Sequence, residues 1–242
     1  MLLGVPVGIV VLLALVLILG ATVQSVVGLG LGLVAAPVVT LLEPSLMPTL
    51  LLVLGLLLPM ATLARERRDI DWPGLAWSLP LRFPGTWLGV LLLAALSERT
   101  LGIAVGITVL LAIGVTASSA VVPKTRGSLM AAGFASGITG TTSAIGGPPI
   151  ALVYQSQPAR QIRSTLAVYF IVGSGLSLAG LGLAGQVATS TIWLGLLLTP
   201  TLLVGTWLGH ALHGRLPEHR MRVAVLGICG GSAMALLVRS LG

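Results

Sequence analysis

Charged side chains divide the chain into long apolar runs. No Asp, Glu, Lys or Arg occurs within residues 1–42, 44–64, 100–123, 127–159 or 164–214. A membrane-spanning helix takes about 20 predominantly apolar residues, so several runs are long enough for more than one helix. Breaks at charges, prolines and glycines predict ten helical elements, at roughly 4–27, 29–43, 46–64, 73–96, 101–121, 128–140, 143–156, 164–184, 188–212 and 220–239.

The composition assigns these elements to a membrane. The chain is 56% hydrophobic and 8% charged, whereas about a quarter of the residues of a soluble domain are charged. We therefore predict an all-α polytopic membrane protein. The net charge of +7 does not indicate nucleic acid, because nearly all Lys and Arg residues lie in short loops between apolar runs.

The chain contains an internal repeat. The segment GTWLG occurs at Gly85–Gly89 and again at Gly205–Gly209, and GLGLGLVAAP (Gly28–Pro37) matches GTTSAIGGPP (Gly140–Pro149) as a block that opens with Gly and closes with Pro. We interpret the chain as two repeats, 1–122 and 123–242, with five elements each. Because five is odd, the second repeat should enter the membrane from the opposite side.

The positive charges agree with this inverted topology and orient the protein. Two basic loop residues, Arg99 and Arg239, fall on one side, which with both termini is expected to lie outside the cytoplasm of a prokaryotic inner membrane. The opposite side carries Arg65, Arg67, Arg68, Lys124, Arg126, Arg160, Arg163, Arg215, Arg220 and Arg222.

Three elements, 29–43, 128–140 and 143–156, are too short to span a membrane comfortably. We therefore expect about eight to ten membrane elements, including half-helices or a re-entrant pair.

Inverted repeats are typical of secondary transporters, whose substrate sites lie at discontinuous helices near the midplane. A half-helix that begins after each Gly-rich break would present free N–H groups and a partial positive charge to an anion. A kink that eases helix packing is the alternative. The candidate contacts at the two breaks are Gly28, Gly30 and Gly32, and Gly140, Thr141, Thr142, Ser143, Gly146 and Gly147.

Arg82 is the one basic residue that lies well inside an apolar element, 73–96. An Arg at the centre of a membrane helix costs about 2.5–3.5 kcal/mol on insertion scales, and such residues usually mark a pathway. Its alternative is a side chain that snorkels to the surface. Arg163 is either a topology charge or a rim contact for anions, and Gln24 and Gln155 are either polar ligands or interhelical bond donors.

The chain resembles the sulfite exporter TauE/SafE family of small prokaryotic membrane permeases. The resemblance rests on GLGLGLVAAPVV in the first repeat, and on SGITGTTSAIGGPPIALVY and ARQIRSTLAVYF in the second. It implies a transporter of sulfite, of sulfonates such as sulfoacetate, or of related organosulfur anions.

The expected function is thus a permease for a small anion, with no enzymatic activity, cofactor or metal. Its expected partners are the anion and the bilayer, and the small-residue faces leave room for a homodimer. Three other functions remain open: a permease for another small anion such as a carboxylate, a non-transporting assembly or scaffold protein, and a membrane hydrolase that pairs Ser174 with His210 or His213.

Overall fold

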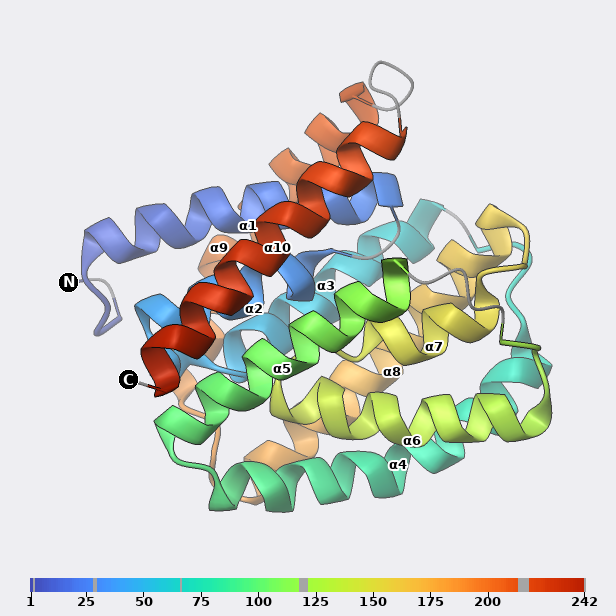
Figure 1. Ribbon diagram of the computed structural model, residues 1–242, viewed down its shortest axis with the longest axis horizontal. Coiled ribbons are helices and arrows are strands. Elements are labelled where there is room, and N and C mark those ends of the chain that lie inside the picture. Colours follow the sequence, from blue (N-terminus) through green and yellow to red (C-terminus); the bar gives the residue numbers. More distant parts are fainter. Residues whose placement is uncertain (2, 28–29, 66, 118–121, 213–217, 242) are drawn as a thin grey trace.

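A computed structural model describes residues 1, 3–27, 30–65, 67–117, 122–212 and 218–241 (Figure 1). The described residues form ten α-helices and one short 3₁₀ turn, Pro44–Leu46, and they contain no strand. The helices are α1 (Val7–Val27), α2 (Leu31–Leu42), α3 (Thr49–Arg65), α4 (Trp72–Ala95), α5 (Glu98–Ala117), α6 (Arg126–Thr142), α7 (Gly147–Tyr154), α8 (Ala159–Leu183), α9 (Thr189–Leu212) and α10 (Glu218–Leu241).

Each of the ten predicted elements corresponds to one helix, so the all-α class is confirmed. The largest difference is the start of α8, which begins at Ala159 rather than near residue 164. The charges of Arg160 and Arg163 suggested a loop there, but the first turns of a helix tolerate charge where they leave the apolar layer. Pro158 is the N-cap and its backbone is not helical. A helix that began more than a turn earlier would place this proline in its interior, where the missing N–H and the ring break the helix.

The break in the second half lies later in the chain than the predicted gap at residues 141–142. Helix α6 continues through Thr142, and Ser143–Gly146 separate it from α7. Thr141 and Thr142 stay helical because their hydroxyls donate to the carbonyls of Gly137 and Ile138 in their own helix. The N-caps of α2 and α7 are Gly30 and Gly146. The predicted match of the two blocks pairs Gly30 with Thr142 instead, so the helix starts depart from that register, and Pro37 lies inside α2.

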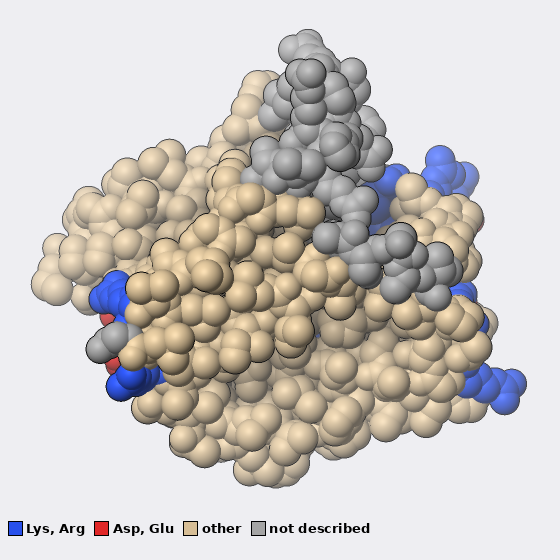
Figure 2. Space-filling model, viewed as in Figure 1, with Lys and Arg blue, Asp and Glu red and all other residues tan. Residues whose placement is uncertain are grey.

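Within the described part of the chain, five helices, α1, α4, α5, α8 and α9, are long and apolar enough to cross a membrane. In Figure 2 the visible Lys and Arg residues gather at two opposite ends of the molecule, with a broad band free of charge between them. The helices run between these ends, and both chain termini lie at the same end (Figure 1). This arrangement is that of a multi-pass membrane protein with the charged ends at the two surfaces.

The two GTWLG segments pack in the same way. In α4, a Cβ added to Gly85 would lie 2.3 Å from the carbonyl oxygen of Phe134 in α6. In α9, a Cβ added to Gly205 would lie 2.5 Å from the carbonyl oxygen of Ile18 in α1. Both motifs thus bring a helix into backbone contact with its neighbour, as small-residue motifs do in membranes.

Helix pairing also follows the order of the predicted repeats. Helix α4 packs on α6 and α9 packs on α1, while α3 packs on α8 and α5 on α10. Exchanging the first five helices with the last five leaves these pairings unchanged. The pairings fit the interpretation of two repeats, while the boundary near residue 122 stays a prediction.

Large apolar side chains cover the outer faces of the long helices. Trp87 in α4 and Trp207 in α9, the tryptophans of the two GTWLG segments, are both exposed, as are Trp72, Trp77 and Trp193. Such exposure would be a liability in water, but it suits a surface that contacts lipid.

Candidate functional site

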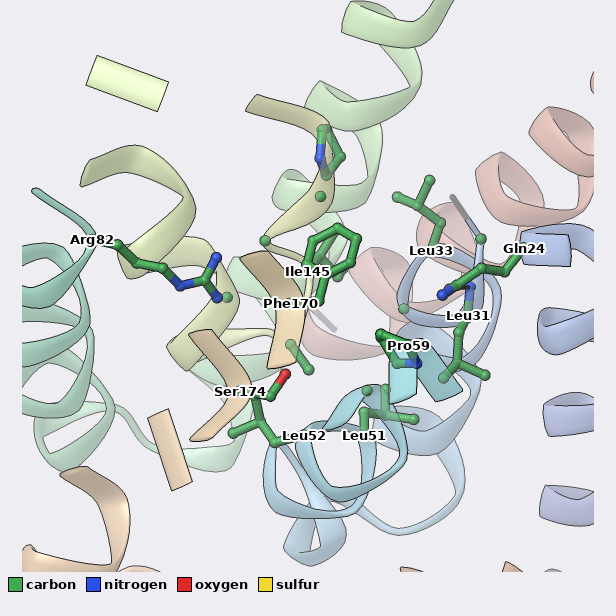
Figure 3. Close-up of a pocket in the computed structure, with 18 residues that line it drawn as sticks. Gln24, Leu31, Leu33, Leu51, Leu52, Pro59, Arg82, Ile145, Phe170 and Ser174 are labelled. Carbon is green, nitrogen blue, oxygen red and sulfur yellow. Dashed lines mark hydrogen bonds between the residues drawn. The ribbon is translucent and has the colours of Figure 1, made fainter. Parts of the chain in front are cut away.

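The two helix breaks meet at one cavity between the halves of the molecule (Figure 3). The cavity has a volume of about 70 Å³, and a single water needs only about 10–15 Å³ by the same kind of measure. It can therefore hold a small anion together with water. It is lined by Gln24, Gly30, Leu31, Gly32, Leu33, Leu51, Leu52, Gly55, Pro59, Arg82, Gly140, Ala144, Ile145, Gly146, Gly147, Pro148, Phe170 and Ser174.

Arg82 is the cationic side chain of this lining. It is 2% exposed, so it does not snorkel to either surface. Its side chain runs from α4 toward the cavity, with the guanidinium at the end nearest the other lining residues (Figure 3). None of the lining residues is acidic, and a guanidinium keeps its proton even when buried. The cavity therefore carries an uncompensated positive charge.

Neutral groups hold the guanidinium in place. Its Nη1 donates to Ser136 Oγ at 3.0 Å, and its Cζ lies 4.4 Å from the centroid of the Tyr169 ring. A cation above an aromatic face is attracted by about 2 kcal/mol when it is desolvated. On α8, a Cβ added to Gly173 would lie 2.0 Å from Arg82 Cζ, so the glycine leaves the room that the guanidinium occupies.

The Nε donor of the Arg82 guanidinium is buried and has no hydrogen-bond partner among the described residues. A buried unpaired donor usually costs about 1–3 kcal/mol, more for a charged group, unless a ligand or water satisfies it. The guanidinium beside the cavity therefore keeps a hydrogen-bonding capacity that the described residues do not satisfy.

Ser136 connects the guanidinium to the break between α6 and α7. Its hydroxyl accepts from Arg82 and donates to the carbonyl oxygen of Gly146, the N-cap of α7. Gly146 can approach because it lacks a side chain, since a Cβ there would lie 3.0 Å from Ser136 Oγ. The position of α7 is thereby tied to that of Arg82.

The two half-helices present different numbers of free N–H groups. In α2 the N–H of Leu31 is capped by Gln24 Oε1 at 3.0 Å, and Gly32 and Leu33 continue the first turn toward the cavity. In α7 the second and third positions are Pro148 and Pro149, which have no N–H to offer. The sequence predicted free N–H groups at the start of each half-helix, and the first turn of α2 offers more of them than that of α7.

Gln24 forms the end of the cavity opposite Arg82. Its carbonyl oxygen is used in the bond to Leu31, and its amide points toward the cavity (Figure 3). A side-chain amide carries two N–H donors on nitrogen. The amide can therefore add a donor opposite the guanidinium.

The structure does not bring all predicted contacts to the cavity. Gln24, Gly30, Gly32, Arg82, Gly140, Gly146 and Gly147 line it, and Gly28 lies outside the described residues. The hydroxyls of Thr141, Thr142 and Ser143 donate to carbonyls one turn earlier in α6 instead. The reason is that α6 remains helical through Thr142, which turns these side chains back onto their own helix.

Two further predicted contacts also lie away from the cavity. Gln155 is exposed at the C-terminal end of α7, and Arg163 is half-buried near the start of α8. Neither residue lines the cavity.

Sequence reasoning missed the contribution of α8 and of Ser136. On α8, the ring of Tyr169 lies against Arg82 and Gly173 leaves space for the guanidinium. The ring of Phe170 and the hydroxyl of Ser174 line the cavity. The available signal was the VGSG segment at Val172–Gly175, which resembles ordinary helix-packing glycines. Only the contact with α4 distinguishes it.

The hydrolase alternative finds no catalytic pair in this cavity. The hydroxyl of Ser174 points into it (Figure 3), but no histidine is among the lining residues. His210 lies exposed on α9, where its Nδ1 pairs with the carbonyl of Thr206. His213 lies outside the described residues.

A family profile described as sulfite exporter TauE/SafE matches residues 12–236 of the chain. The match covers nearly the whole length and contains every lining residue of the cavity. No curated protein and no solved structure matches the chain significantly.

Proposed function

The chain belongs to the sulfite exporter TauE/SafE family of membrane transporters, and on this premise we propose that it carries sulfite or an organosulfonate through the cavity beside Arg82. The observation that supports this proposal is the state of Arg82. Its guanidinium is buried and unpaired at Nε, and no lining carboxylate neutralises it.

The chemistry of the cavity suits an oxyanion. Guanidinium groups bind planar or pyramidal oxygen sets through two parallel N–H donors. The first turn of α2 and the Gln24 amide add neutral donors on the opposite side. Leu51, Leu52 and Phe170 supply an apolar wall, against which the short carbon chain of an organosulfonate can lie.

Outward movement of such an anion needs no coupling ion. A negative charge that leaves the cell moves down the membrane potential, which contributes about 2.3 kcal/mol per charge per 100 mV. No lining residue is a carboxylate that would hold a cation or a proton. We therefore propose outward uniport, and uphill uptake of sulfite by sealed vesicles would contradict it.

Thermal stabilisation by a panel of small anions tests the site. A ligand that binds the folded state adds about 2.7 kcal/mol when present at 100 times its dissociation constant. We expect sulfite or a short sulfonate to raise the melting temperature of the purified protein, and we expect Arg82→Ala to abolish this shift. The binding anion is then the substrate for a flux assay in proteoliposomes.

A matched variant separates the role of Arg82 from a general loss of charge. Arg126 lies exposed at the start of α6, above the ring of Trp77, so Arg126→Ala should keep the anion response. Equal responses from wild type and Arg82→Ala would refute the site. Stabilisation by carboxylates alone would instead favour a carboxylate permease, and no response to any anion would favour a scaffold protein.

A further inference from the structure

A second buried polar cluster lies away from the cavity, around Asp71. The carboxylate Oδ2 of Asp71 accepts from the hydroxyl of Tyr154 at 2.6 Å and pairs with Lys124 Nζ at 2.6 Å. The backbone N–H of Asp71 donates to Thr165 Oγ1 at 3.0 Å. The side chain of Asp71 is 9% exposed, so this is a largely desolvated, charge-assisted network.

These contacts join four segments that are distant in the sequence. Asp71 is the N-cap of α4, Lys124 precedes α6, Tyr154 ends α7 and Thr165 lies in α8. Space for the network depends on Gly74, because a Cβ there would lie 2.0 Å from both Asp71 Oδ2 and the Tyr154 hydroxyl. Asp71 thus ties four segments together, through its carboxylate to Lys124 and Tyr154 and through its backbone N–H to Thr165.

The loop before α4, which contains Asp71, makes a second ion pair. Asp69 faces Arg160 of α8 at 3.9 Å, but both side chains are more than half exposed, so this pair contributes little. Both ion pairs found among the described residues therefore lie at this end. At the opposite end, Arg99 and Arg239 donate to backbone carbonyls.

The Asp71 cluster and the cavity contact opposite ends of α7. The N-cap Gly146 is bonded to Ser136 and through it to Arg82, whereas Tyr154 at the other end is bonded to Asp71. Eight helical residues span about 12 Å. Because α7 is only eight residues long and is bonded at both ends, we expect a displacement of one end to displace the other.

A buried apolar layer connects Tyr154 at the Asp71 cluster with Tyr169 beside Arg82. Its members Ile150, Val153 and Leu166 are each at most 3% exposed. An anion that leaves the cavity toward this end must displace this layer, which requires α7 to move on α6, α5 and α8, the helices that it packs on. Because Tyr154 moves with α7, that movement requires its bond to Asp71 to break.

We infer that Asp71, Lys124 and Tyr154 form a latch, a set of bonds that keeps the cavity closed toward the end of the protein that carries Arg67, Arg68 and Arg126, called here the arginine-rich end. When these bonds break, movement of α7 opens the cavity to that side. The role of the latch in transport rests on the proposed function, whereas the latch itself does not depend on the identity of the anion.

The latch stays charged at neutral pH. Burial raises the pKa of Asp71, but hydrogen bonds from Lys124, Tyr154 and the Gly74 backbone lower it by more than burial raises it. The net pKa of Asp71 therefore lies below its ordinary value. A carboxyl group with a lowered pKa loses its contribution only as the pH falls through that pKa in acid. The trigger for opening is therefore movement of α7, and protonation of Asp71 is not required.

Thiol accessibility tests the latch without any anion. The background is Cys229→Ala, which removes the one cysteine, and the reporter is Ala151→Cys. Ala151 lies in α7 between Gly147 and Tyr154 and packs against the apolar layer. A charged, membrane-impermeant thiol reagent applied at the arginine-rich face measures how often this position becomes accessible.

Asp71→Asn should raise the labelling rate about tenfold, which corresponds to about 1.4 kcal/mol. Tyr154→Phe and Lys124→Gln should raise it in the same direction, and they decide the question if Asp71→Asn does not accumulate. Asp69→Asn is the matched control from the same loop and should leave the rate unchanged.

An unchanged rate in the folded latch variants would overturn the inference, as would an equal rise in Asp69→Asn. The outcome is independent of the proposed substrate. A protein that no anion stabilises but whose labelling rises in Asp71→Asn would retain the latch and lose the proposed function.

Discussion

At the scale of the residue, the guanidinium of Arg82 is positioned by neutral contacts. Tyr169 lies against one face, Ser136 accepts from Nη1, and Gly173 leaves the space that the guanidinium fills. A carboxylate partner would hold the group more strongly, but it would also cancel the charge that an anion needs. Neutral positioning keeps both the geometry and the charge.

Gly173→Ala tests this positioning. The added Cβ would overlap the guanidinium, which is the flexible end of a side chain, so Arg82 should swing away while the fold persists. We expect the anion concentration needed for half-maximal thermal stabilisation to rise at least tenfold. The control is Gly175→Ala, because a Cβ there meets nothing within 4 Å. Equal effects in the two variants would show that Gly173 serves helix packing alone.

At the scale of the element, glycines set the distance between helices that carry the cavity. The added-Cβ distances at Gly85 and Gly205 are to backbone oxygens of Phe134 and Ile18, and backbone cannot yield as a side chain does. The pairs α4–α6 and α1–α9 are therefore close and stiff. This stiffness leaves the short helices α2 and α7 as the elements most able to move between them.

Gly85→Ala and Gly205→Ala should destabilise the protein by similar amounts. Overpacking of a tight contact usually costs about 1–3 kcal/mol, and the same motif makes the same contact in both places. Gly114→Ala in α5 is the control, because a Cβ there meets nothing within 4 Å. Thermal unfolding in detergent measures all three, and a cost at one motif alone would argue against equivalent repeats.

At the scale of the whole molecule, Lys and Arg are distributed unevenly between the two ends. The loops and adjoining helix ends at residues 67–71, 122–126 and 155–163 lie at the end opposite to both termini (Figure 1). They carry Arg67, Arg68, Lys124, Arg126, Arg160 and Arg163, whereas the other end carries Arg99 and Arg239. The excess of Lys and Arg in these loops predicts that this end faces the cytoplasm. The termini and the α4–α5 loop would then face outward.

Labelling of whole cells checks this orientation. In the Cys229→Ala background, Ser97→Cys places a thiol in the exposed α4–α5 connection, and Ser156→Cys places one in the exposed α7–α8 connection. An impermeant thiol reagent should modify the first in intact cells and the second only after permeabilisation. The reverse pattern would invert the topology and, with it, the side that the Asp71 latch closes.

The sequence by itself determined the positions of the helices, the membrane class of the protein and Arg82 as the main candidate for the anion site. Long apolar runs require helices in lipid, where each backbone group must be bonded within its own segment. This requirement is local, so the ten elements could be predicted closely. Arg82 was identifiable for the same reason, because a charge inside an apolar run is unusual wherever the chain folds.

Only the tertiary structure decided which polar groups surround that charge. Thr141, Thr142 and Ser143 lie beside the break in sequence, yet helical geometry turns their hydroxyls onto their own carbonyls. Ser136 and Gly173 look like packing residues until α6 and α8 meet α4. These contacts depend on the rotation and spacing of helices far apart in the chain, and hydrophobic periodicity carries no record of either.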